Sequence, residues 1–137
     1  MKFLIDENVN VTAVTALRSI YADHSFSTVS DQKWRGLPDV DLFKAMGDAQ
    51  FSVIVTRDVR QLDDPTERAV LRDQGIHWVG LPSPKFGGLK GLALETAAVV
   101  AGLSYVLEGI GTETPPTAFR LHGVPSEAKQ RVRIEPL

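Results

Sequence analysis

The chain opens with a short apolar run that ends abruptly in polar side chains. Phe3–Ile5 favours a strand, and Asp6, Glu7 and Asn8 follow it directly. A strand that is apolar at every position is typical of a parallel sheet, whose two faces are both covered. In open α/β sheets, ligands bind beyond the carboxyl ends of the strands. We therefore expect the polar group after Ile5 at the functional edge of a sheet.

Strand-like and helix-like segments alternate along the first 81 residues. Strands are expected over residues 3–5, 25–29, 52–56 and 76–81, and helices over residues 9–22, 39–49 and 64–75. The helix signals include apolar positions spaced by three and four, and a cap with proline at the first helical position. The alternation predicts a single α/β domain, residues 1–137, with a Rossmann-like, mainly parallel sheet and helices on both faces.

The last third of the chain has a different pattern. Residues 89–108 are nearly all apolar, with Glu95 as the one acid inside the run. A membrane span is one interpretation, but the internal acid favours a long buried or interface helix and no membrane. The excess apolar surface predicts contact with a second copy, as a homodimer, or with a partner's helix. Residues 118–122 and 131–134 alternate apolar and polar side chains and predict two edge strands.

Composition limits the classes of function. The 137 residues carry a net charge of -2, with 43% hydrophobic and 23% charged residues, as in an ordinary globular domain. The acidic balance does not favour nucleic-acid binding by overall charge, so a local basic patch or bound metals would be needed. The absence of cysteine excludes disulfides and thiolate metal sites. That absence, with no signal-peptide pattern at residues 1–9, favours a cytoplasmic location.

Three acids occupy comparable positions in the expected fold. Asp6 ends the first strand, Asp39 opens the second helix and Asp58 follows the third strand, so a doubly wound sheet can bring them to one edge. Glu7 and Asp41 can join them. Clustered carboxylates are costly without a cation, and oxygen ligands suit Mg²⁺ or Mn²⁺. Such a site can cleave phosphodiesters, with one ion activating water and another stabilising the leaving oxygen.

Other polar residues near this edge are candidates for substrate binding. Lys33, Trp34, Arg35 and Arg57 flank the expected acidic site and can bind phosphate and stack a base. Asn8 is grouped with them because it lies beside the acids. The competing interpretation is an ordinary solvated loop with one tryptophan directed into the core, and acids that serve only as helix caps and turn residues.

Three segments also carry a family resemblance. They read MKFLIDENV (1–9), GLPDVDLF (36–43) and VIVTRD (53–58). Together they resemble the PIN-like nuclease family, of the DUF5615 and VapC-like toxin kind. The resemblance covers residues 1–81, while the C-terminal helix and tail, residues 82–137, carry no matching motif. It implies a Rossmann-like sheet and a Mg²⁺- or Mn²⁺-dependent ribonuclease that acts on RNA, often as the toxin paired with an antitoxin protein.

By this resemblance, Asp6, Asp39 and Asp58 take the catalytic and metal-binding roles. The family often has a further acid two positions after the last of these, where this chain has Arg60. The departure leaves open a catalytically inactive PIN-like binding module. A receiver-like phosphoacceptor domain is a second alternative, because it too has acids after its first and third strands. Stable phosphorylation of Asp58 by acetyl phosphate would indicate the receiver.

Overall fold

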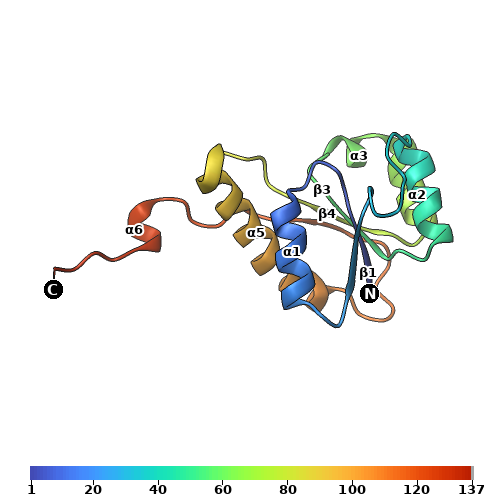
Figure 1. Cartoon of the computed structure of the whole chain (residues 1–137). Helices are drawn as coiled ribbons and strands as arrows, with labels where there is room; N and C mark the ends of the chain where they lie inside the picture. Colours follow the sequence, from blue (N-terminus) through green and yellow to red (C-terminus); the bar gives the residue numbers. More distant parts are fainter. Residues whose placement is uncertain (137) are drawn as a thin grey trace.

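The computed structural model describes residues 1–136, which form a five-stranded, all-parallel sheet between two layers of helices (Figure 1). The strands are β1 (Lys2–Ile5), β2 (Ser25–Thr28), β3 (Val53–Thr56), β4 (His77–Gly80) and β5 (Ala118–Arg120). The helices are α1 (Val11–Ile20), α2 (Asp39–Asp48), α3 (Arg60–Asp63), α4 (Pro65–Asp73), α5 (Gly88–Gly109) and α6 (Ala128–Arg131). The predicted α/β class and parallel sheet are confirmed.

The strand order places β1 between β2 and β3. Across the sheet the order is β2-β1-β3-β4-β5, so the chain leaves β1 in one direction and later resumes on its other side. Ile5 lies beside Thr28 on one flank and beside Val55 on the other. This reversal makes the carboxyl ends of β1 and β3 the switch point of the sheet, where ligands bind in doubly wound folds.

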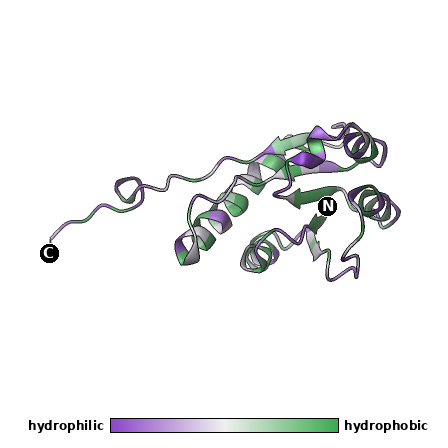
Figure 2. Cartoon of the chain, turned by 90° about the horizontal axis from the view of Figure 1, so that it is seen from above, coloured by the Kyte–Doolittle hydropathy of each residue, from purple (hydrophilic) through white to green (hydrophobic). Residues whose placement is uncertain are grey.

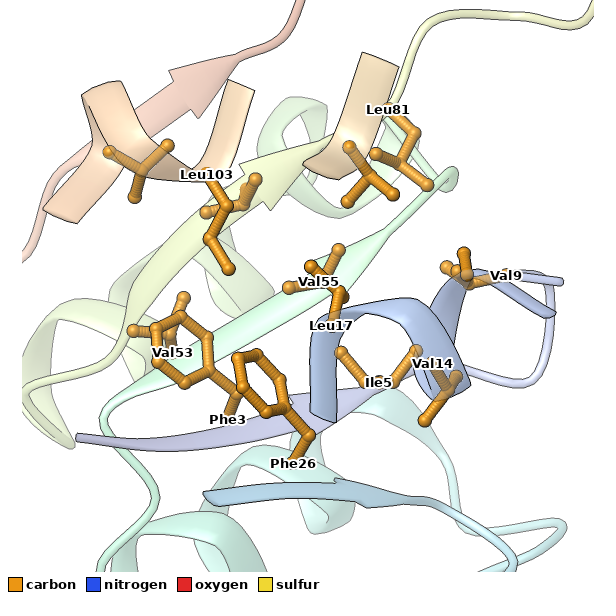
Figure 3. Packing of buried hydrophobic residues seen from close by; sticks show 14 residues of the cluster. Phe3, Ile5, Val9, Val14, Leu17, Phe26, Val53, Val55, Leu81 and Leu103 are labelled. Atoms are coloured by element: carbon orange, nitrogen blue, oxygen red, sulfur yellow. The ribbon is translucent and has the colours of Figure 1, made fainter. Parts of the chain in front are cut away.

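One face of the sheet packs against α1 and α5 and forms the first core. Phe3, Val53 and Val55 point from neighbouring strands toward Leu17 of α1 and Leu103 of α5 (Figure 3). All five side chains are fully buried. Burying each large apolar side chain stabilises the fold by about 1.5–3 kcal/mol before entropy is counted. This core therefore holds the long C-terminal helix on the sheet.

The opposite face packs against α2 and α4 and forms the second core. Leu4 and Ile54, which alternate with the residues of the first face, pack with Phe43 of α2, Leu71 of α4 and Trp78 of β4. Hydropathy shows the same arrangement, with apolar strands between helices whose outer surfaces are polar (Figure 2). Because both faces are covered, the buried positions of β1, residues 3–5, are all apolar.

Side-chain caps explain where two of the helices begin. Asn10 Oδ1 accepts a hydrogen bond from the Thr12 backbone at 2.9 Å, at the start of α1. The Asp64 carboxylate accepts from the backbones of Thr66 and Glu67, at 2.8 and 3.1 Å, and so caps α4 as the sequence predicted. In α2 the cap position is proline, which places Asp39 inside the first turn.

Helix α5 is long and apolar enough to cross a membrane by length and composition. In the fold it connects β4 to β5, and its residues Val99, Leu103 and Val106 are fully covered by the first core. Its other side is open, since Leu89 is 84% exposed and Tyr105 is 72% exposed. The helix is thus the crossover between β4 and β5. One of its sides packs in the first core, and the apolar side chains of Leu89 and Tyr105 are exposed.

The tail departs from the prediction of two edge strands. Residues 118–120 do form β5, which pairs in parallel with β4. The second strand, predicted over residues 131–134, is wrong: Arg131 ends α6, and residues 132–136 have no regular structure. This segment extends away from the domain (Figure 1), so no neighbouring strand can pair with it. Alternation of side chains produces a strand only where such a partner exists.

Candidate functional site

The centre of the site is a buried hydroxyl at the end of β3. Thr56 is fully buried and donates to Asp6 Oδ2 at 2.6 Å. The same oxygen of Thr56 accepts from the backbone of Asp58 at 3.0 Å and from Asn8 Nδ2 at 3.1 Å. Thr56 therefore joins the acid that follows β1 to the turn that follows β3, across the switch point.

Asp6 is held in one orientation by several donors. Its Oδ1 accepts from the backbone of Glu7 at 2.7 Å, and its Oδ2 accepts from Asn8 Nδ2 at 2.8 Å as well as from Thr56. Asn8 Oδ1 in turn accepts from the backbone of Arg57 at 2.9 Å. The polar residues after β1 are thus connected to β3 by a small hydrogen-bond network.

Asp58 is paired with Arg60, the residue that departs from the family pattern. Arg60 Nε donates to Asp58 Oδ1 at 3.0 Å and Arg60 Nη2 donates to Oδ2 at 2.8 Å, which forms a two-point contact. This pairing lowers the pKa of Asp58 below its ordinary value. The Arg60 side chain is itself largely exposed. One acid of the site is therefore neutralised by a neighbouring cation that solvent can reach.

Asp39 is positioned by a buried amide. Gln61 of α3 is fully buried, and its Nε2 donates to Asp39 Oδ1 at 2.9 Å. The Oε1 of the same amide accepts from Trp78 Nε1 at 3.1 Å. Trp78 belongs to the second core, so its indole holds the Gln61 amide in place. The amide in turn holds the Asp39 carboxylate. The orientation of Asp39 is thereby set by the packing of the domain.

Negative charge accumulates around Asp39. Burial raises the pKa of Asp39, and the charges of Asp6 and Asp58 raise it further against the opposing hydrogen bond from Gln61. Burial, followed by the charges of Asp39, Asp64 and Asp58, also raises the pKa of Glu67 in the first turn of α4. Acids from β1, β3, α2 and α4 therefore interact at one edge of the sheet.

The donors and charges of these residues suit a divalent cation. Within residues 1–136, no three acidic or histidine side chains are already arranged around one point as a metal site. Their chemistry does fit: carboxylate oxygens are the ligands that Mg²⁺ and Mn²⁺ prefer. Burial is the main cause of the raised pKa of Asp39, and repulsion from Asp6 and Asp58, which a cation would relieve, adds to it. Asp6, Asp39 and Asp58 are the residues suited to hold it, with Glu67 beside them.

The remaining residues expected to bind metal or substrate include four that are exposed. Glu7 is exposed, and its carboxylate lies 3.3 Å from Arg35 Nε, which also donates to Ser30 Oγ. Asp41 is exposed on α2, two residues after Asp39. Lys33 is exposed in a left-handed backbone conformation, with φ of 61°. Arg35 therefore contacts the polar segment after β1 through its ion pair with Glu7.

Trp34 and Arg57 are both engaged with the protein. The Trp34 ring packs at the edge of the second core, 5.7 Å from the Phe51 ring centroid, as in the core-facing interpretation of this loop. Arg57 forms an ion pair with Glu95 of α5. Stacking or phosphate binding by these two residues would have to use the part of each side chain that remains exposed.

Sequence reasoning missed Thr56, Gln61 and Glu67 as parts of the site. Glu67 follows the rule that identified Asp39, because both acids lie in the first turn of a helix that follows a strand. Applied to every helix, that rule would have found it. Gln61 gives no local signal, because its role depends on Trp78, which is far along the chain and only meets it in the folded core.

Comparison with known proteins gives one match. A family model described as "PIN like domain" matches residues 1–83. The match spans β1 to β4 and contains Asp6, Asp39, Asp58 and Glu67. No curated protein and no solved structure matches the chain.

Proposed function

This chain belongs to the PIN-like domain family, and from that premise we propose that it is a Mg²⁺- or Mn²⁺-dependent endoribonuclease. PIN-like domains are generally nucleases. The observation that carries the proposal is the meeting of acids from β1, β3 and α2 at the switch point, where Asp39 is under the influence of both Asp6 and Asp58. A VapC-like toxin acting on cellular RNA, paired with an antitoxin, is the biological role we propose.

The residues of the site would divide the work as follows. Asp6, Asp39 and Asp58 would hold the cation, which supplies Lewis acidity toward a phosphodiester when bound. Thr56 keeps Asp6 oriented, and Gln61 keeps Asp39 oriented, so that less rearrangement is needed when substrate arrives. Positively charged side chains at the rim, such as Arg35, would attract the RNA backbone.

A catalytically inactive binding module is the second candidate, and Arg60 is the observation that favours it. Its guanidinium contacts both carboxylate oxygens of Asp58. A cation fixed in the protein at this place supplies part of the charge that a metal would supply. The nuclease proposal therefore requires Arg60 to leave Asp58, which its exposure permits. The family match favours both candidates over a receiver-like domain.

The test is RNA cleavage by purified protein with Mg²⁺ or Mn²⁺ and with a chelator. We expect metal-dependent cleavage, and we expect Asp6→Asn to reduce it by at least about a hundredfold, since even outer ligands of metal sites matter 10–100-fold. Asp48→Asn is the matched control, because it removes an exposed acid at the other end of α2 from Asp39. Equal cleavage by wild type and Asp6→Asn would reject the nuclease. Metal binding without cleavage would support the inactive module.

The apolar outer side of α5 supports a proposed protein partner. Leu89 and Tyr105 are exposed at opposite ends of this helix. A second copy of the chain, forming a homodimer, would cover them, and an antitoxin helix is the alternative occupant. We expect Tyr105→Glu to shift a wild-type dimer to a monomer in light scattering. A wild type that is monomeric at high concentration and has no partner would reject this surface.

A further inference from the structure

A pocket of about 310 Å³ lies beyond the carboxyl ends of β4 and β5, against α5. Its walls are the loop after β4, the first half of α5 and the segment after β5, and they include Phe86, Glu95, Ala98 and Gly123. Its volume is at the lower end of the ~300–1,000 Å³ range of ligand pockets. It can therefore accept one small, flat group.

A buried carboxylate forms the polar part of this pocket. The Glu95 side chain is 8% exposed, and it pairs with Arg57 and accepts from the backbone of Asn10 at 3.3 Å. Two carboxylate oxygens offer about four acceptor positions, so Glu95 can accept further hydrogen bonds. An ionised carboxylate offers no donor. The pocket thus favours a ligand that presents N–H groups.

Glu95 is also connected to the acidic site. Arg57 joins them, because its side chain pairs with Glu95 and its backbone donates to Asn8 Oδ1. Asn8 in turn donates to Asp6 Oδ2. Two residues, Arg57 and Asn8, therefore connect Glu95 in the pocket to Asp6 in the acidic site. A nucleotide whose phosphate lay at the acids would have its base directed to one side or the other of Arg57.

We propose that this pocket binds an RNA base bearing an exocyclic amino group, namely adenine, cytosine or guanine, next to the cleaved phosphate. The inference rests on the proposed ribonuclease function and names a specificity element of its substrate. Amino groups donate to the carboxylate of Glu95, whereas uracil has no amino group and offers only its ring N–H, which lies between two carbonyl oxygens that a carboxylate repels. The pocket therefore selects against uracil.

The rest of the pocket suits the remainder of a nucleotide. Phe86 is 38% exposed and offers a ring on which a base can stack. Lys90 Nζ lies 4.1 Å from the centroid of that ring, and Lys85 also lines the pocket. These cations can neutralise a neighbouring phosphate. Almost all of the pocket lies after residue 83, beyond the residues that match the family model.

The direct test is binding of mononucleotides to the full chain by calorimetry, which requires no cleavage. We expect AMP, CMP and GMP to bind at least about tenfold more tightly than UMP, the effect of one hydrogen bond to a charged group. Ribose 5-phosphate, which has no base, should bind as weakly as UMP. Equal binding of all four nucleotides, or of ribose 5-phosphate, would overturn the proposal.

Two variants locate the binding in this pocket. A Cβ added at Gly123 meets nothing within 4 Å, so Gly123→Leu should fold and fill the pocket, abolishing nucleotide binding. Gly111→Leu, beyond the far end of α5, is the matched control and should bind as wild type does. Glu95→Gln, which adds a donor, should reduce the preference over UMP to less than about twofold. Unchanged binding by Gly123→Leu would refute the assignment.

The outcomes separate this inference from the nuclease proposal. Selective nucleotide binding by a protein that cuts no RNA would reject the nuclease and support the pocket as a base-binding site. Metal-dependent cleavage with no base preference in either binding or the mapped cut sites would retain the nuclease and overturn the pocket.

Discussion

At the scale of single residues, Asp39 carries an electrostatic cost at neutral pH. Burial and neighbouring acids raise its pKa, so the folded state binds this proton before the unfolded chain does. The contribution of Asp39 to stability therefore rises as pH falls through the folded pKa. Asp39→Asn removes the charge but keeps an oxygen for Gln61. We expect its melting temperature to exceed that of wild type by roughly 2–4 °C at pH 7.

The same measurement at lower pH is the control for this prediction. The advantage of Asp39→Asn should shrink as the pH falls through the raised pKa of Asp39, because the wild-type carboxyl then also becomes neutral. Thermal unfolding as a function of pH measures this change. A variant that melts below wild type at pH 7 would contradict the electrostatic account and indicate that the hydrogen bond with Gln61 matters more.

Arg60 gives a second prediction about one side chain. Arg60→Ala removes the guanidinium from both oxygens of Asp58 and keeps the backbone hydrogen bond to Oδ1, so the pKa of Asp58 should rise toward its ordinary value. Mn²⁺ should then bind more tightly, because a competing cation has been removed. Carboxyl-carbon NMR and electron paramagnetic resonance titration with Mn²⁺ measure the two effects. Arg72→Ala, a similar change in the last turn of α4, should alter neither. Unchanged Mn²⁺ affinity in Arg60→Ala would show that Asp58 does not bind the ion.

Residue by residue, the candidate site was predictable only in part. The positions of Asp6, Asp39 and Asp58 follow from where strands end and helices begin, and the sequence displays both. The hydrogen bonds made by Gln61 and the pairing of Arg57 with Glu95 depend on side chains from distant elements. Such contacts arise from tertiary packing, which local periodicity does not encode.

At the scale of elements, periodicity predicted β1 to β4 and helices α1, α2, α4 and α5. It missed α3, because four residues are too few to show a helical repeat. The failure over residues 131–134 has the opposite cause. The pattern was present there, but strand formation depends on a neighbour, and this segment has left the sheet (Figure 1).

Helix α5 should contribute to stability mainly through its buried side. Leu103 is fully buried in the first core, so Leu103→Ala should lower the free energy of unfolding by about 2–5 kcal/mol. Tyr105→Ala, at an exposed position two residues away, should change it by less than about 0.5 kcal/mol in a monomer. Urea denaturation measures both. Similar losses in the two variants would show that the outer side of α5 is also covered in solution.

At the scale of the whole molecule, the tail and β5 should differ in importance. A chain that ends at Glu127 loses α6, which projects from the domain, and should keep the wild-type melting temperature within about 2 °C. A chain that ends at Ile110 also loses β5 and the side chains of Phe119 and Leu121, which pack against the first core. That chain should be strongly destabilised. Calorimetry and circular dichroism measure both, and an unaffected melting temperature in the shorter chain would contradict the role of β5.

The parallel pairing of every strand also affects how fast the chain can fold. No two neighbouring strands are joined by a tight turn, so each pairing must close a loop that contains a helix or more. Chains dominated by such distant contacts fold slowly, in milliseconds to seconds for domains of this kind. Until β3 forms, the apolar residues of β1 have no partner on one flank. Stopped-flow refolding should therefore be slow, and yield should fall as protein concentration rises, because the unpaired strands can associate with other chains.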